Sequence, residues 1–170
     1  MFVPIILGTA REGRQSEKVA KYILKQVKNY GLSTELIDVR DFLISKTDNT
    51  KTLPQAKILE EKIGKANGLI IVAPEYNHSY PGELKLMLDM LYSEFAGKPL
   101  GICGVSAGPL GGGRMVEQLR LVSVELHMIP IREALYFPFV QNLFEGEEIK
   151  DPQYSERVKK FLDELTSYVK

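Results

Sequence analysis

The sequence predicts an α/β fold with a doubly wound sheet of five parallel strands, in a single domain that spans residues 1–170. Five short apolar runs alternate with five amphipathic helical patterns. This alternation is typical of a parallel sheet covered by helices on both faces, and right-handed crossovers then make it doubly wound. No linker, repeat or low-complexity tract interrupts the chain, whose length suits one domain with a sizeable core.

The composition excludes several classes of protein. A hydrophobic fraction of 44% and a charged fraction of 26% are typical of soluble globular proteins. The formal net charge is zero, so no electrostatic argument favours nucleic acid or an anionic membrane as a partner. One cysteine excludes an internal disulfide and a cysteine-rich metal cluster. We expect no metal, no membrane span and no signal peptide, and therefore a cytoplasmic location.

The first half of the chain supplies three strands and two helices. The strands are expected at residues 3–7, 36–39 and 69–73. The first helix follows Ser16, a plausible N-cap, and ends at Gly31. Its apolar stripe consists of Val19, Ala20, Ile23, Leu24, Val27 and Tyr30. The second helix presents Ala56, Leu59, Ile63 and Ala66.

Residues 40–54 form a polar connection between the second strand and the second helix. They contain turn signals at Asp48, Asn49, Thr50 and Pro54. The connection is long for this position in an α/β fold, so a role at the ligand-binding edge of the sheet is expected, although its nature is open.

The second half supplies two strands and three helices. Apolar residues of the helix expected over 81–93 cover more than one face, which indicates either a subunit interface or deep burial within the monomer. Strands are expected at 100–105 and 128–131, and residues 132–152 read as a long connection. The helix between these strands presents Met115, Leu119, Val122 and Leu126. The last helix presents Val158, Phe161, Leu162, Leu165 and Val169.

The polar stretch after the third expected strand is the first candidate site. Glu75, Tyr76, Asn77 and His78 lie between that strand and a helix that starts near Pro81, with Ser79 as a possible cap. In open α/β sheets, ligands bind where strands lead into helices. The stretch could also be an ordinary connection with turn-forming residues.

The loop between Gly8 and Ser16 is a candidate phosphate site. The P-loop pattern fails because Arg14 and Gln15 follow Gly13 where lysine and a hydroxyl should stand, and the Gly-x-Gly-x-x-Gly pattern is absent. A mononucleotide phosphate held without metal fits better, because helix amides and a guanidinium both favour an anion. The candidate ligands are Thr9, Arg11, Gln15 and Ser16. The alternative is that the charged residues of this loop are solvated surface residues.

A third candidate loop, residues 106–114, contains four glycines. Glycine lets a backbone approach a ring or a phosphate closely, although a plain helix-entry loop is the alternative. With the strand order 2-1-3-4-5, in a three-layer sandwich, the loops after strands one, three and four converge on one crevice.

Together these motifs resemble the NAD(P)H-dependent FMN reductases, which include chromate and quinone reductases and azoreductase-like members. The motifs are Gly8-Thr9-x-Arg11, the run from Pro74 to Lys85, and Ser106-x-Gly108 with its glycines. The resemblance covers most of the chain. Thr9 stands where many members have serine, and residues 40–54 and 132–152 match no motif of the family.

The resemblance implies a flavodoxin-like fold, non-covalent FMN, NAD(P)H as co-substrate, and a homodimer or homotetramer, expected through the helix over 81–93. It places the phosphate on Thr9, Arg11, Gln15 and Ser16. It places the flavin ring against Pro74, Glu75, Tyr76, Asn77, His78, Ser106 and Gly108.

By the same resemblance, hydride passes from nicotinamide to FMN and on to a quinone, azo, metal-oxyanion or flavin acceptor in a ping-pong mechanism. No catalytic side chain is assigned, because the cofactor supplies the chemistry. A loop histidine such as His78 is more often positional, Cys103 reads as core, and His127 as a packing or capping residue. The alternatives are an FMN-binding electron carrier without NAD(P)H activity and a flavin-free protein on the same fold. The physiological acceptor and the preferred nucleotide stay open.

Overall fold

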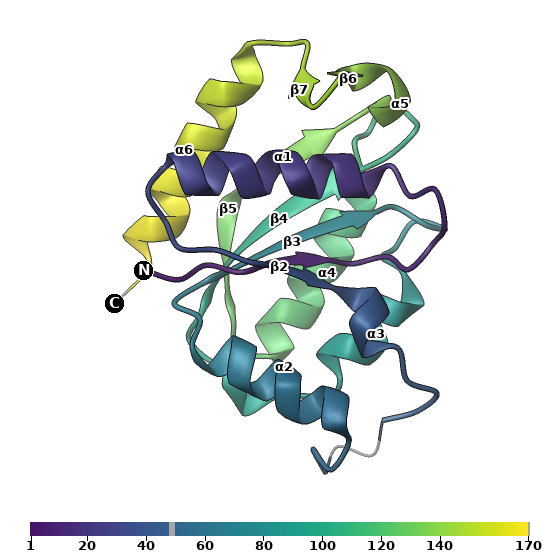
Figure 1. Cartoon of the computed structure of the whole chain (residues 1–170), viewed down its shortest axis with the longest axis vertical. Helices are drawn as coiled ribbons and strands as arrows, with labels where there is room; N and C mark the ends of the chain where they lie inside the picture. Colours follow the sequence, from purple (N-terminus) through teal and green to yellow (C-terminus); the bar gives the residue numbers. More distant parts are fainter. Residues whose placement is uncertain (48–49, 170) are drawn as a thin grey trace.

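The structure of the chain, a computed structural model, describes residues 1–47 and 50–169. Five parallel strands form one sheet in the order β2-β1-β3-β4-β5, which confirms the predicted topology (Figure 1). The strands are β1 (Ile5–Leu7), β2 (Leu36–Asp38), β3 (Leu69–Pro74), β4 (Pro99–Val105) and β5 (Ile129–Phe137). Because the order reverses beside β1, the carboxyl ends of β1 and β3 diverge into loops that flank a crevice.

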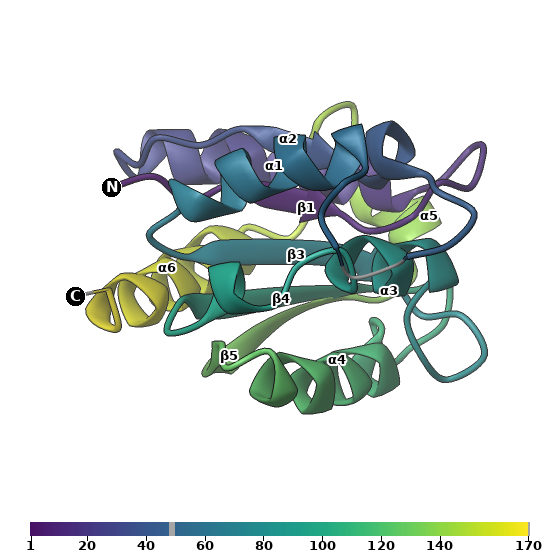
Figure 2. The same ribbon diagram turned by 90° about the horizontal axis from the view of Figure 1, so that it is seen from below.

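Helices cover both faces of the sheet and complete the three layers. In Figure 1, α1 (Ser16–Asn29) and α6 (Gln153–Ser167) lie above the sheet. The other face is covered by α2 (Pro54–Gly64), α3 (Gly82–Leu88) and α4 (Gly113–Glu125), which stand in front of the sheet in Figure 2. No helix among the described residues is long and apolar enough to cross a membrane.

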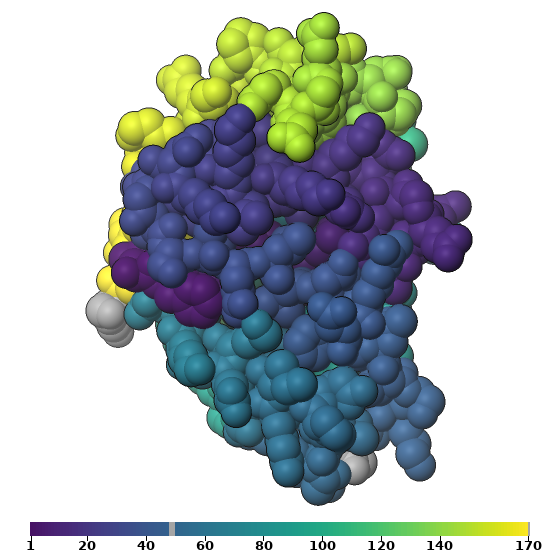
Figure 3. All heavy atoms as spheres, viewed as in Figure 1, coloured from purple at the N-terminus to yellow at the C-terminus, as the bar shows by residue number. Residues whose placement is uncertain are grey.

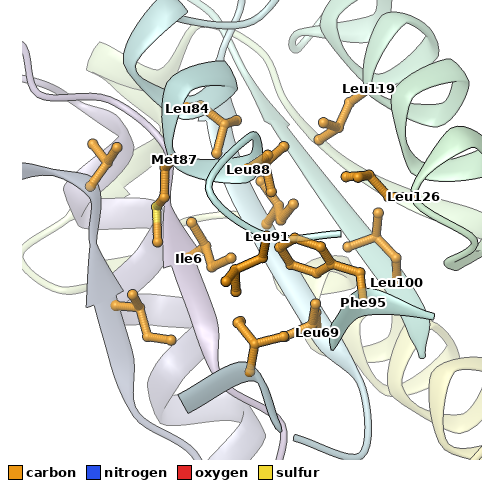
Figure 4. Close-up of a cluster of buried hydrophobic side chains, with 14 of the residues drawn as sticks. Ile6, Leu69, Leu84, Met87, Leu88, Leu91, Phe95, Leu100, Leu119 and Leu126 are labelled. Atoms are coloured by element: carbon orange, nitrogen blue, oxygen red, sulfur yellow. The ribbon is translucent and has the colours of Figure 1, made fainter. Parts of the chain in front are cut away.

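The core has two parts, one on each face of the sheet. Strands buried on both faces read as continuous apolar runs, which is why the sequence reveals them. On the face covered by α3, Leu84 and Leu88 pack in one cluster with Ile6 and Leu100 (Figure 4). On the other face, α1 and α6 pack against the alternate side chains of the same strands, such as Ile5.

The helix expected over 81–93 is shorter than predicted. It ends at Leu88, and a 3-10 turn, η2 (Ser93–Phe95), follows. Met90 is only 2% exposed, so the deep burial that was the alternative holds for this residue. The apolar spacing in the sequence continues past the end of α3 because residues that follow this helix are still buried in the core. Ser79 does not cap the helix, whose N-cap residue is Pro81.

The last strand is longer than predicted. β5 extends to Phe137, so the first part of the expected 132–152 connection is strand. The rest contains α5 (Val140–Leu143) and a hairpin of β6 (Phe144–Glu145) and β7 (Glu148–Ile149). This hairpin lies against α1, and the yellow-green and blue-purple atoms of the two segments adjoin in Figure 3. Glu148 of β7 forms an ion pair with Lys25 of α1.

An irregularity in β5 explains why its pattern is hard to read. The register with β4 shifts, so that Leu100 pairs with Pro130 but Ile102 pairs with Ala134. The extra residues form a bulge whose backbone groups bond to side chains. Arg120 donates to the carbonyl oxygens of Ile131 and Arg132, at 2.7 and 2.8 Å. The Glu164 carboxylate accepts the amides of Arg132 and Glu133, at 3.0 and 2.9 Å.

The start of the connection over residues 40–54 belongs to a 3-10 turn, η1 (Val39–Phe42), that follows β2 directly. Pro54 begins α2 rather than marking a turn. The turn expected at Asp48 and Asn49 lies outside the described residues. Beyond it, Lys51 forms an ion pair with Glu94, which joins this connection to η2.

Candidate functional site

The three loops that the sequence singled out meet in one cleft of about 420 Å³ at the carboxyl edge of the sheet. This volume falls within the roughly 300–1,000 Å³ of small-molecule sites. Its lining comes from the loop after β1, the ends of β3 and β4, and Val140 of α5. The arrowheads of these strands point to this edge, on the right of Figure 1.

Most of the predicted site residues line the cleft, and four do not. Those that line it are Arg11, Gln15, Ser16, Pro74, Glu75, Tyr76 and Ser106. Those outside the lining are Thr9, Asn77, His78 and Gly108. The lining also includes residues that were not among the predicted site residues, namely Glu12, Gly13, Arg14, Val105, Ala107 and Val140. The apolar residues among these could not be predicted as site residues, because in a sequence they look the same as residues of the core.

The start of α1 offers a cradle of hydrogen-bond donors. Within the described part of the chain, the amides from Glu12 to Glu17 donate to no protein acceptor. The Ser16 hydroxyl is buried and has no partner among the described residues either, so it does not act as the predicted N-cap. Unpaired amides at a helix start, together with an orphaned hydroxyl, are the donor set that a phosphate group requires. The residues present therefore fit the phosphate of a mononucleotide.

Arg11 stands beside this cradle with its guanidinium exposed. Its contact is with the Tyr76 ring, whose centroid lies 5.6 Å from the guanidinium carbon. A cation over an aromatic face is held weakly at an exposed site. The Arg11 side chain can therefore turn toward an anion at the helix start.

Arg14 is a structural residue rather than a solvated one. Its side chain is 3% exposed and forms a two-point ion pair with Asp38 at the end of β2. The hydrogen bond that Arg14 donates to Asp38 raises the pKa of Arg14. Burial alone would raise the pKa of the Asp38 carboxyl, but hydrogen bonds from Arg14 and the Arg40 amide hold it below its usual range. No local pattern in the sequence predicts an ion pair between residues 24 positions apart.

Thr9 is buried under the cleft rather than exposed in it. Its hydroxyl donates to Glu83 Oε1 at 3.2 Å, and the same oxygen accepts the amide of Ala10 at 2.8 Å. Glu83 lies in the first turn of α3, so it ties the loop after β1 to the loop after β3. In this arrangement Thr9 supports the phosphate cradle from below.

The side chain of Glu75 is directed at α4. Its carboxylate accepts the backbone amide of Arg114 at 3.1 Å and the guanidinium Nη1 at 2.8 Å. Burial by itself would raise the pKa of Glu75, but the bonds from Arg114 hold it below its usual range. The backbone amide of Glu75 donates to the carbonyl of Val105, which joins β3 and β4 at the cleft. Glu75 therefore shapes the wall through its main chain while its side chain anchors a helix.

Asn77 and His78 form the tip of a tight turn. Tyr76 and Ser79 exchange backbone hydrogen bonds of 2.9 Å in both directions. Between them, Asn77 and His78 both have positive φ, at 50° and 65°. This is the geometry of a two-residue type I′ turn. It turns both side chains out of the cleft, and His78 lines a separate shallow cavity with Arg114 instead.

The glycine run after β4 serves packing. A Cβ on Gly112 would lie 2.6 Å from the amide nitrogen of Val105, and Gly112 has a φ of 85°. Glycine is required there so that α4 can start directly against the strand. Ser106 donates its hydroxyl to the carbonyl of Gly108 at 2.8 Å, which closes the loop on itself.

Other chemically notable residues lie apart from the cleft. Cys103 is fully buried in β4, and burial raises the pKa of its thiol, so it is a core residue. His127 is exposed and packs edge-on against Tyr92. Among the described residues, no group of three or more His, Cys, Asp or Glu side chains could hold a metal ion.

A sheet in this strand order, with a cleft that contains unpaired donors at its switch point, defines the class as flavodoxin-like α/β proteins, whose mononucleotide sites lie at this edge. Comparison with known protein families identifies the chain more specifically than the fold does. The family described as NADPH-dependent FMN reductase matches residues 1–142. The chain belongs to this family and is an NAD(P)H-dependent oxidoreductase of the FMN reductase and azoreductase type. Membership implies FMN and NAD(P)H as the redox pair.

Similar proteins agree with this assignment. An FMN-dependent NADPH-azoreductase of Staphylococcus haemolyticus is 28% identical, over 97% of this chain and 93% of that protein. An NAD(P)H-dependent FMN reductase of Schizosaccharomyces pombe is 33% identical, over 79% of this chain and 72% of that protein.

Solved structures show the same fold. The flavoenzyme NAD(P)H:acceptor oxidoreductase FerB of Paracoccus denitrificans matches with a TM-score of 0.81 at 22% identity, over 98% of both chains. A flavodoxin of Streptococcus pneumoniae matches with a TM-score of 0.62 at 15% identity, over 99% of this chain and all of that one. Such distant matches establish the architecture alone.

Proposed function

We propose that this chain binds FMN without a covalent bond and transfers reducing equivalents from NAD(P)H to a second small molecule in the same cleft. The acceptor would be a quinone, an azo compound, a metal oxyanion or a free flavin. The observation that supports this function best is the unpaired donor set at the start of α1, beside a cleft wide enough for a ring system.

Each part of the cleft has a distinct task in this proposal. The amides of residues 12–17, the Ser16 hydroxyl and the Arg11 guanidinium hold the phosphate, with Gln15 at the edge. The ends of β3 and β4, including Pro74, Tyr76 and Ser106, form the walls against the flavin ring. When bound, FMN would supply the redox chemistry by accepting a hydride and passing it on. The protein orients the partners and excludes water between the walls.

The two substrates would use one cleft in turn, because residues 1–47 and 50–169 show no second cleft that includes the unpaired donors at the start of α1. This predicts ping-pong kinetics. Purified protein supplied with FMN should be yellow, lose its colour on anaerobic mixing with NADPH or NADH, and regain it with an acceptor from a panel. Double-reciprocal plots should give parallel lines. Protein that retains no FMN would contradict the proposal, and intersecting lines would contradict the shared cleft.

An electron carrier without NAD(P)H activity is the second candidate, favoured by the fold that the chain shares with a flavodoxin. Carrier flavodoxins are usually strongly acidic, whereas the formal net charge here is zero. Flavin that binds but is bleached by neither nucleotide would assign this function instead.

The quaternary structure and the location in the cell are also proposals. We propose a homodimer or homotetramer in the cytoplasm, with no nucleic acid or membrane as partner. The burial of Met90 removes part of the second apolar face that was expected on the helix over 81–93, and Leu86 of α3 is the partly exposed residue that remains. A different surface, on α4, is therefore the better candidate for the contact between subunits.

A further inference from the structure

We propose that Arg40 is a positioning residue for phosphate binding, which acts together with the Arg14–Asp38 ion pair to fix the backbone of residues 9–11. This inference rests on the proposed function, and it assigns a role to the segment after β2. Arg40 does not line the cleft, so it would act through the loop and not on the ligand.

Two arginines hold three consecutive carbonyl groups of the loop after β1. Arg14 Nη1 donates to the carbonyl of Thr9 at 2.5 Å. Arg40 Nε donates to the carbonyl of Ala10 at 3.1 Å, and its Nη2 donates to the carbonyl of Arg11 at 2.7 Å. Carbonyl oxygens would repel a phosphate dianion, so their capture by cations elsewhere favours an anion on the other side of the loop.

Because the peptide bond is planar, holding these carbonyl groups also sets the direction of the neighbouring N–H donors. A trans peptide places the N–H of the next residue opposite the carbonyl. Fixing the carbonyl of Arg11 therefore fixes the direction of the Glu12 amide, which is the first of the unpaired amides at the cleft. The same rule holds two peptide bonds earlier, where Arg14 holds the Thr9 carbonyl and Glu83 accepts the Ala10 amide from the opposite side.

Asp38 sets the position of both arginines. Its carboxylate pairs with the Arg14 guanidinium, and its Oδ1 also accepts the backbone amide of Arg40 at 3.0 Å. Asp38 is the last residue of β2, a strand of the rigid sheet, and Arg40 lies in η1 directly after it. Through Asp38, the end of β2 positions the two arginines that hold the loop after β1, and it does so before any ligand binds. Such preorganisation lowers the entropic cost of binding.

The test compares FMN with riboflavin, which has the same ring system but no phosphate group. Arg40 is exposed, so Arg40→Gln should leave the fold intact. We expect this variant to bind FMN more weakly, on the order of tenfold, because two bonds from a charged donor are lost. Riboflavin affinity should stay within about twofold of wild type. Arg40→Lys keeps the charge but cannot hold two carbonyls, and should lie between. Fluorescence titration of each apo-protein with FMN and with riboflavin measures the affinities of wild type and of both variants.

Arg120→Gln is the matched control. Arg120 also donates to two consecutive backbone carbonyls, but those of the β5 bulge, away from the cleft. Its variant should melt at a lower temperature and keep the wild-type ratio of FMN to riboflavin affinity. That ratio separates positioning of the loop from general loss of stability.

Four results would overturn the inference. Unchanged FMN affinity in Arg40→Gln would show that the loop after β1 binds phosphate without the hydrogen bonds from Arg40. Equal losses for FMN and riboflavin would show a general effect, as would a fall in the ratio for Arg120→Gln. Wild-type protein that binds no FMN at all would contradict the proposed function itself, and the inference with it.

Discussion

The carboxylate of Glu75, one residue beyond β3, caps α4 by accepting the backbone amide of Arg114 in the first turn of that helix. The N-cap residue of α4 is Gly112, which has no side chain to do so. The carboxylate also favours the positive end of the helix dipole and pairs with the Arg114 guanidinium. One side chain thus fixes the spacing between two of the three loops that form the cleft.

Replacing Glu75 with alanine should therefore destabilise the protein. The change leaves the Arg114 amide without its acceptor and removes a charged bond to the half-exposed Arg114 guanidinium, so we expect a loss of about 0.5–2 kcal/mol in the free energy of unfolding. Urea denaturation of the apo-protein measures it. Glu117→Ala is a control on the same helix, because Glu117 is 68% exposed and makes only a long pair with Arg120. Equal unfolding midpoints for both variants would contradict the capping role.

The turn at Asn77 and His78 makes a prediction about backbone strain. His78 has a φ of 65°, which glycine adopts freely and β-branched residues avoid. We expect His78→Gly to be neutral or stabilising by about 0.4–1 kcal/mol, and His78→Val to be destabilising by about 1–3 kcal/mol. Thermal unfolding distinguishes the two.

The same pair tests whether His78 takes part in catalysis. Since its side chain points away from the cleft, His78→Gly should retain the turnover of wild type with NADPH and a quinone. A large loss of turnover in a stable His78→Gly protein would mean that the imidazole does act on a substrate.

The pairing of Glu94 with Lys51 predicts a pH dependence of stability. Burial alone would raise the pKa of Glu94, but bonds from Lys51 and backbone amides lower it from 4.5 to about 2. The unfolded chain therefore binds this proton at higher pH than the folded one. The stabilisation is fully present above pH 4.5 and is lost as the pH falls toward 2.

Melting temperatures measured across this range should show the effect. The difference between wild type and Glu94→Gln should be largest near neutral pH and shrink as the solution is acidified. Glu60→Gln is the control, because Glu60 contacts the same lysine but is 43% exposed and screened by solvent. A constant difference between wild type and Glu94→Gln at every pH would argue against the ion pair as its source.

The exposed apolar residues of α4 make a prediction about assembly. Leu121 and Val124 are 68% and 64% exposed, one turn apart on the same helix. Such neighbouring exposed residues favour a contact between copies of the chain. We expect light scattering to show an oligomer for wild type and smaller particles for Leu121→Glu plus Val124→Lys.

A control variant separates this contact from a general effect of surface charge. Ile58→Glu changes a residue of α2 that is 51% exposed, and it should leave the oligomer intact. Unaltered particles in the α4 double variant would place the interface elsewhere, and a wild-type monomer would remove the proposal.

The strand order and the meeting of the three loops were predictable, because buried parallel strands and the turns after them leave local patterns. The length of β5 was not, because Arg132 and Glu133 interrupt its apolar run where the bulge lies. The end of α3 was predicted too late. Met90 is buried although the helix has already ended, so its apolar side chain continues the helical spacing in the sequence.

Within the site, the sequence indicated which loops matter but not which atoms face the cleft. Gln15 and Ser16 lie in its lining, whereas Thr9 lies beneath it because Glu83 holds its hydroxyl. The roles of Arg14 and Asp38 depend on a contact between residues far apart in the chain. Such contacts leave no periodic trace in a single sequence.

The bulge in β5 has a consequence for how copies of this protein meet one another. β5 is the outermost strand on its side of the sheet, and an open edge strand can pair with a strand of another molecule. At residues 132 and 133 the amides that could serve such pairing are already bonded to the Glu164 carboxylate of α6. The Glu164 side chain thereby accepts the hydrogen bonds that a sixth strand would accept, and this disfavours edge-to-edge aggregation of the sheet.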